Sequence, residues 1–156
     1  MEKEIPHQVF QETICVAAQQ KAILYEKSHY LSIRWEGDGA TAHQDTVRDF
    51  QRILPKPAAQ EELVLMKEDK TPGSTVKHKF YRLLANATKP SNRVLVIVHY
   101  AGHSFIDNKG RLRFAERLTN GRDFDAKHYL TSLVRSTEYG LCNATNVDVL
   151  FIFDCS

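Results

Sequence analysis

Residues 94–104 have the sequence VLVIVHYAGHS, and this stretch decides the fold class. Its first five residues are all apolar, which is typical of a strand covered on both faces at the centre of a parallel sheet. A second, almost wholly apolar run occupies 147–153. Polar or small residues follow both runs, at 100–104 and at 154–156. Because ligands bind beyond the carboxyl ends of parallel strands, these two segments are the first candidates for chemistry.

Strands and helices alternate along the rest of the chain. Short apolar or aromatic runs bounded by turn residues predict two further strands, over 30–35 and 63–66. Apolar residues at helical spacing predict amphipathic helices over 7–27, 41–54, 74–87 and 125–134. This order predicts an α/β domain, a three-layer sandwich with a mainly parallel central sheet and helices on both faces.

Short polar motifs give the expected helix starts and one turn. Residues 41–44 have the form of a capping box, so a helix is expected to begin there. Ser74 or Thr75 is expected to cap the next helix, and Asp125 the last one. Residues 107–110 have the composition of a turn, which predicts a small hairpin.

Composition excludes several classes of function. The 156 residues carry 21 Lys+Arg against 19 Asp+Glu, a net charge of +2, which favours neither nucleic acid nor an anionic membrane as a partner. No run is long enough to span a bilayer, and residues 1–6 lack the apolar core of a signal peptide. Three scattered cysteines (Cys15, Cys142 and Cys155) without zinc spacing suit a reducing compartment, cytosol or nucleus. Neither a metal nor another cofactor is expected.

The two strand ends together resemble the caspase and metacaspase superfamily of cysteine peptidases. That family has Tyr-x-Gly-His-Gly after its third core strand and Asp-x-Cys after its fourth; this chain has Tyr-Ala-Gly-His-Ser at 100–104 and Asp-Cys-Ser at 154–156. The resemblance covers 30–156. It implies a flavodoxin-like topology, with 1–28 as a leading amphipathic helix and 29–156 as the large-subunit portion. That portion would be truncated at the nucleophile position and therefore incomplete at its C-terminus.

The resemblance also assigns roles to individual residues. His103 would be the general base and acid of a Cys–His dyad, and Ser156 occupies the position of the catalytic cysteine. The backbone N–H groups of Ser104 and of residue 156 would stabilise the oxyanion. Asp154 would line an acidic pocket for a basic substrate side chain. Asp38, on the loop after the first strand, is a weaker candidate for substrate binding.

Serine at position 156 changes the expected activity. A hydroxyl is far less acidic than a thiol, so peptide-bond hydrolysis is expected to be low or absent. Cys155 is no simple substitute, because one step along a strand reverses the side-chain direction. The expected partners are a peptide or protein substrate and a small-subunit-like segment or another protein. The alternative is a catalytically dead caspase-fold module that acts through protein contacts in a setting such as programmed cell death.

Two other readings of the same residues are weaker. Residues 102–104 resemble the start of a Gly-x-Ser-x-Gly nucleophile elbow, but the β-branched Ile106 stands where the strained turn needs a small residue. A doubly wound ligand-binding domain would carry a glycine-rich phosphate loop after its first strand. Gly37 and Gly39 are present there, without the third glycine or the Lys-Ser/Thr pair.

Overall fold

The computed structural model describes residues 25–37, 59–88, 93–135 and 146–155, together with residues 9, 12–14, 16, 17, 20, 48 and 52. Most of the helix expected over 7–27 lies outside the described residues, although the isolated described positions from 9 to 20 are helical. The helix expected over 41–54 lies outside them too, apart from two helical positions, and so does its capping box. Asp38 and Ser156 also lie outside.

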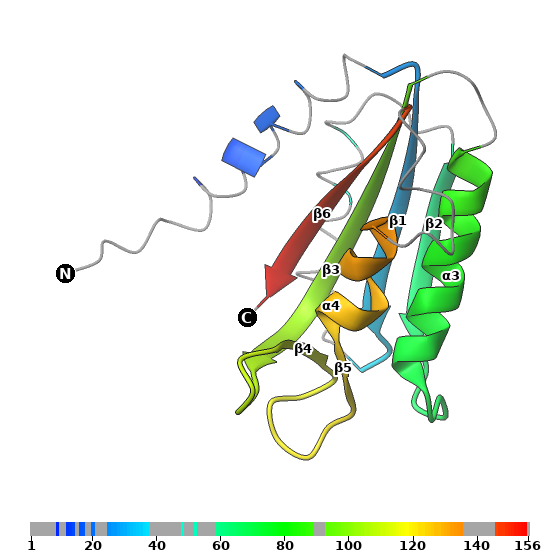
Figure 1. Cartoon of the computed structure of the whole chain (residues 1–156). Coiled ribbons are helices and arrows are strands. Elements are labelled where there is room, and N and C mark those ends of the chain that lie inside the picture. The colour runs from blue at the N-terminus through cyan, green and yellow to red at the C-terminus, as the bar shows by residue number, and fades with distance from the viewer. Residues whose placement is uncertain are drawn as a thin grey trace.

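The described residues form one open, mixed sheet of six strands (Figure 1). Its strands are β1 (Lys27–Trp35), β2 (Ala59–Leu65), β3 (Val94–Ile106), β4 (Leu112–Ala115), β5 (Asp123–Asp125) and β6 (Val147–Cys155). The order is β2-β1-β3-β4-β5, with β6 also paired to β3. Strands β1, β2, β3 and β6 are mutually parallel where they pair, and β4 and β5 are antiparallel additions. The predicted α/β class is confirmed.

Strand β3 is longer than its apolar run predicts. It spans 13 residues, and Val94–Tyr100 lie between β1 and β6. His103 to Ile106 then pair antiparallel with β4, so the Tyr-Ala-Gly-His-Ser segment lies within the strand and not after it. The turn expected at 107–110 is confirmed as the hairpin between β3 and β4. Gly110 has a φ of +73°, a left-handed conformation that glycine adopts without steric cost.

Helix α3 (Pro72–Ala87) begins earlier than predicted. Its N-cap residue is Thr71, with Pro72 in the first turn, so the expected caps at Ser74 or Thr75 are wrong. The reason is an acidic side chain upstream. Asp69 accepts hydrogen bonds from the Thr71 N–H at 2.8 Å and from the Thr75 hydroxyl at 2.6 Å, which fixes the turn that leads into the helix.

The helix expected over 125–134 is divided in two. Helix α4 (Ala126–Tyr129) is a single turn, and η1 (Thr131–Arg135) is a 3₁₀-helix. Asp125 caps α4 as predicted, because its carboxylate accepts the His128 N–H at 3.0 Å. The break falls at Leu130, whose φ of −131° and ψ of −74° are not helical.

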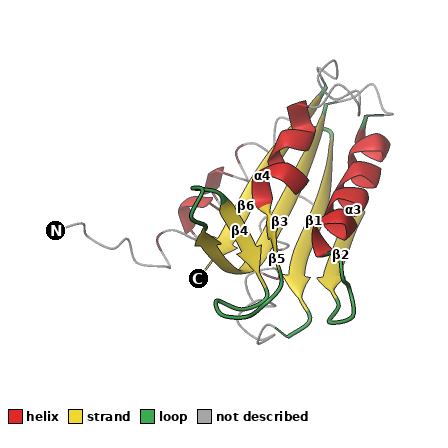
Figure 2. Cartoon of the chain, turned by 60° about the horizontal axis from the view of Figure 1, so that its bottom comes forward, coloured by secondary structure: helices red, strands yellow, loops and turns green. Residues whose placement is uncertain are grey.

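Side-chain alternation divides the core between the two faces of the sheet. Helices α3 and α4 cover the same face, as Figure 2 shows. The larger cluster on that face includes Ile33, Val76, Phe80, Leu84, Val96 and Val98. A smaller cluster on the other face consists of Tyr30, Leu95, Ile97 and Ile152. In the described ranges, no helix has the length and apolarity needed to cross a membrane.

Candidate functional site

The two polar segments singled out in the sequence lie side by side. Strand β6 lies beside β3 and pairs with it in parallel (Figure 1). In this ladder Asp154 is opposite Ala101, and Cys155 is opposite Gly102. This register places the end of β6 next to the residue that precedes His103. Both strands run in the same direction, so the segments meet at one edge of the sheet.

The main chain of His103 is fixed by strand β4 and by the side chain of Tyr100. It lies opposite Ala115 in the ladder between β3 and β4, and its ring is partly buried, with Nδ1 inaccessible to solvent. The hydroxyl of Tyr100 donates a 2.8 Å hydrogen bond to the His103 carbonyl. That hydroxyl in turn accepts the indole N–H of Trp35 at 3.0 Å. The backbone at His103 is therefore tied to the end of β1 through a buried phenol.

The hairpin determines where the Ser104 N–H points. The Asp107 N–H donates to the Arg111 carbonyl at 3.0 Å, which makes these two residues a hydrogen-bonded pair. Hydrogen-bonded and non-hydrogen-bonded pairs alternate along an antiparallel ladder. Counting back through the register, Ser104 and Phe114 form a non-hydrogen-bonded pair. The Ser104 N–H is therefore directed away from β4.

The side chain of Ser104 contacts the thiol of Cys155. Burial raises the pKa of that thiol; the neighbouring Asp154 charge adds to the rise, and the Ser104 hydrogen bond opposes it. Cys155 packs on the face covered by α3. Alternation along β3 puts His103 on the opposite face from Ser104. The Cys155 thiol, with its raised pKa, therefore contacts a hydroxyl and lies on the opposite face of the sheet from the His103 ring.

The remaining predicted site residues divide between described and undescribed positions. Asp154 lies in β6, partly buried, opposite Ala101. Asp38 and Ser156 lie outside the described residues. Within the described ranges, no group of three His, Cys, Asp or Glu side chains is arranged to hold a metal ion.

Arg122, which directly precedes β5, links the β4–β5 hairpin to the end of β1 and to the turn after β2. Its guanidinium donates to the carbonyls of Met66, at 2.8 Å, and of Asp69, and it lies 5.4 Å from the ring centre of Trp35. It also pairs with Glu116 through two hydrogen bonds of 3.3 Å. These bonds, the Arg122 charge and the nearby backbone lower the pKa of the Glu116 carboxyl.

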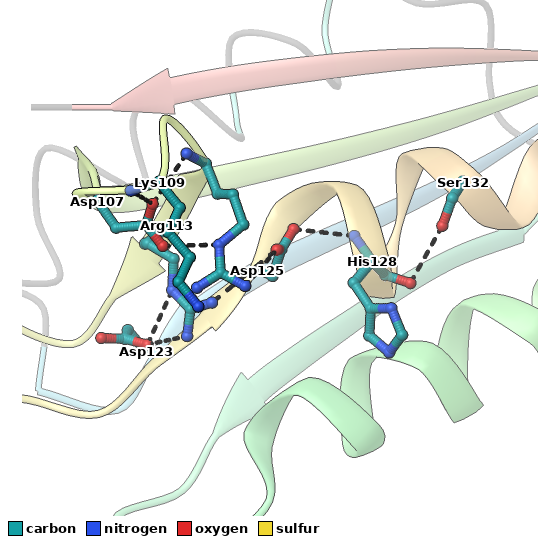
Figure 3. Close-up of polar contacts among 8 residues, drawn as sticks. Asp107, Lys109, Arg113, Asp123, Asp125, His128 and Ser132 are labelled. Carbon is teal, nitrogen blue, oxygen red and sulfur yellow. Dashed lines mark hydrogen bonds and ion pairs between the residues drawn. The ribbon is translucent and has the colours of Figure 1, made fainter.

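Oppositely charged side chains lie close together along the β3–β4 turn and the β4–β5 ladder (Figure 3). Arg113 pairs with Asp123, and Arg111 pairs with Asp107 at 2.8 Å. The backbone N–H of Arg111 is the main cause of the lowered pKa of Asp107. Sequence reasoning missed these contacts, although Arg111 just before β4, Arg113 within it, and Asp123 and Asp125 in β5 have the spacing that gives cross-strand ion pairs.

Comparisons of this chain with protein-family models, with curated proteins and with solved structures find no match. The functional proposal therefore depends on the motif resemblance and on the geometry of β3 and β6.

Proposed function

We propose that this chain is a caspase-fold domain, with a flavodoxin-like parallel sheet between two helical layers. Its sheet supports this assignment, because the parallel strands have the order β2-β1-β3-β6. The chain passes from β1 out to β2 and returns beyond β1 to β3. Such a reversal opens a crevice at the carboxyl ends of the strands, where ligands of open α/β sheets bind. Helices α3 and α4 would form one of the two layers.

Within that class, the domain is of the cysteine-endopeptidase type, built to hydrolyse peptide bonds. The observation that carries this proposal is the pairing of Gly102 with Cys155, which sets the two family motifs side by side. His103 would take the proton from a nucleophile at position 156 and return it to the departing amine. The Ser104 N–H, directed away from β4, would stabilise the oxyanion. Asp154 would favour a basic side chain in the substrate.

The chain as it stands would be inactive or nearly so, because position 156 carries a hydroxyl. Serine needs a stronger activating base than a thiol does. Cys155 offers no replacement, since burial raises its thiol pKa and its contact is Ser104. These observations favour a second candidate function, a caspase-fold module that has lost hydrolysis and acts through contacts with another protein.

The pairing of His103 with position 156 can be tested without a substrate. In a Cys155→Ala/Ser156→Cys variant, an adjacent imidazolium would lower the pKa of the new thiol and speed its alkylation at pH 6.5. Replacing His103 by Ala should then slow alkylation by about tenfold, the equivalent of one pKa unit. His128→Ala is the matched control and should leave the rate unchanged. If the thiol at position 156 is alkylated at the same slow rate with and without His103, the proposal of a Cys–His peptidase site is wrong.

Hydrolysis separates the two candidate functions. Peptides with Arg, Lys or Asp before the scissile bond should be cleaved by the Ser156→Cys variant faster than by its His103→Ala derivative if the catalytic apparatus persists. A lowered thiol pKa without cleavage of any peptide would favour the interaction module.

A further inference from the structure

A separate pocket lies between the β3–β4 turn and the α4–η1 segment. Its volume is about 750 Å³, within the range of sites for small ligands. The hairpin contributes one wall and α4 with η1 the other. Both walls contribute basic side chains: Lys109 and Arg111 from the hairpin, and Lys127 and Arg135 from α4 and η1. The apolar part of the lining includes Leu112 and Phe153.

The charges of this pocket are not balanced by its own lining. Arg111 is compensated, since its Nε lies 2.8 Å from Asp107 and its Nη1 lies 3.7 Å from Asp125. For Lys109, Lys127 and Arg135, the described residues provide no carboxylate within ion-pairing distance. Among the residues that the structure describes, no acidic side chain lines the pocket. Three cations around one hollow concentrate positive potential there, which favours an anion.

The neighbouring pocket shows the contrast. It has a volume of about 480 Å³ and lies against the start of α3. Its lining includes Asp123 and Asp125 beside Arg113, and Arg113 is already paired with Asp123. Its acidic residues therefore offset most of its positive charge, and Lys70 is the one lysine or arginine of its described lining without an ion pair, against three in the first pocket.

We propose that the pocket between the hairpin and α4–η1 binds a small phosphomonoester with an apolar or aromatic body. A phosphate group carries up to two negative charges and three acceptor oxygens, which suits a pocket lined by three such cations better than a single carboxylate does. Phe153 and Leu112 offer an apolar surface for the rest of the molecule. Phe153 is itself fixed by an edge-on contact with Phe114, with ring centres 4.9 Å apart. This proposal does not depend on the proposed peptidase-type function.

Phenyl phosphate is the probe, with inorganic phosphate, benzoate and hexaglutamate as comparators, each titrated into the full chain by calorimetry. Phenyl phosphate should bind most tightly, and its affinity should rise between pH 5 and pH 7.5 as the dianion forms. Arg135→Gln and Lys127→Gln should each weaken binding about tenfold or more, as expected for a charge-assisted hydrogen bond. Lys67→Gln, an equal charge change on the turn after β2, should have no effect.

Each other outcome overturns the proposal or part of it. Lack of phenyl phosphate binding, or equal weakening by Lys67→Gln, would show that no defined site exists. If inorganic phosphate binds as tightly as phenyl phosphate, Phe153 and Leu112 do not contribute to binding. Tighter binding of hexaglutamate with the same residue dependence would identify an acidic polypeptide as the occupant instead. All three substitutions lie at exposed positions, and thermal melting would verify that the variants are folded.

Discussion

The hydroxyl of Tyr100 donates a 2.8 Å hydrogen bond to the carbonyl of His103, three residues further along the same strand. The Tyr100 ring is fully buried and stacks on Phe114, with centres 3.8 Å apart and planes inclined by 10°. The same hydroxyl accepts the Trp35 indole N–H. One phenol thus joins β1, β3 and β4 at the point where β3 leaves the parallel sheet.

Removing this hydroxyl is expected to destabilise the protein. Tyr100→Phe keeps the stacked ring but leaves the Trp35 N–H and the His103 carbonyl without this partner. An unsatisfied buried group costs about 1–3 kcal/mol, and we expect a loss in that range in the free energy of unfolding measured in urea. Tyr129→Phe is the matched control, since Tyr129 belongs to the same aromatic cluster, 6.2 Å from Phe124. Equal stability of the two variants would contradict the structural role of the Tyr100 hydroxyl.

The apolar pattern predicted the inner strands because a strand buried on both faces needs an apolar residue at every position. It did not predict that β3 would continue to Ile106. Gly102 and Ser104 resemble turn residues, and their ladder partner β4 comes later in the chain. Periodicity also failed at Leu130, because an α-turn followed by a 3₁₀-turn buries the same side as one continuous helix.

The site was predictable only in part for a related reason. Adjacent parallel strands bring their ends together, so the sequence could predict that residues 100–102 lie beside 153–155. The contact between Ser104 and Cys155 did not, since it depends on the extension of β3. Likewise, Lys109 and Lys127 look like ordinary solvated charges until the fold sets the hairpin opposite α4.

Gly73 is required by close packing at the start of α3. A Cβ built at this position would lie 2.5 to 2.7 Å from three carbons of the Tyr129 ring. Gly73→Ala should therefore lower the free energy of unfolding by about 1–3 kcal/mol, although alanine favours helix. Gly37→Ala is the control, because its nearest neighbour would be Lys67 Cε at 4.0 Å.

The double variant Gly73→Ala/Tyr129→Leu separates the clash from any backbone effect. If the ring is the obstacle, the two substitutions will cost less together than the sum of their separate effects. Strict additivity, or a Gly73→Ala variant as stable as the parent chain, would be incompatible with the close contact.

Arg122 is expected to hold the β4–β5 hairpin against the ends of β1 and β2. Lysine cannot reproduce its paired bonds to Glu116 together with those to the Met66 and Asp69 carbonyls. Arg122→Lys should destabilise the fold by about 1–3 kcal/mol and speed amide exchange in the hairpin. Arg117→Lys, at an exposed position of the same hairpin, should change neither quantity.

The same substitution has a pH signature at Glu116. Arg122 lowers the pKa of this carboxyl in the folded state, so the pair stabilises the protein above the unfolded pKa. That contribution is lost as the pH falls through the folded pKa. In Arg122→Lys, the Glu116 pKa followed by NMR titration should rise toward its ordinary value. An unchanged pKa would mean that the Glu116–Arg122 pair does not persist in solution.

The Cys155 thiol is expected to ionise only above its usual pH range. Burial is the largest cause of its raised pKa, and the Ser104 hydrogen bond is the main opposing influence. Alkylation of Cys155 by iodoacetamide, followed by peptide mass spectrometry, should therefore show a midpoint above that of the urea-unfolded chain. Because the folded pKa is the higher one, the stability that this thiol contributes is present below the unfolded pKa and declines as the pH rises through the folded pKa.

Ser104→Ala tests the cause of this shift. It removes the hydrogen bond that lowers the Cys155 pKa, so the alkylation midpoint should move to still higher pH. Ser132→Ala is the matched control, because the Ser132 hydroxyl is bonded to the His128 carbonyl and is not among the groups that influence this thiol. A midpoint that falls in Ser104→Ala, or a folded midpoint at or below the unfolded one, would contradict the contact between β3 and β6. It would also restore Cys155 as a candidate nucleophile, because a thiol that ionises readily at this strand end could react where Ser156 cannot.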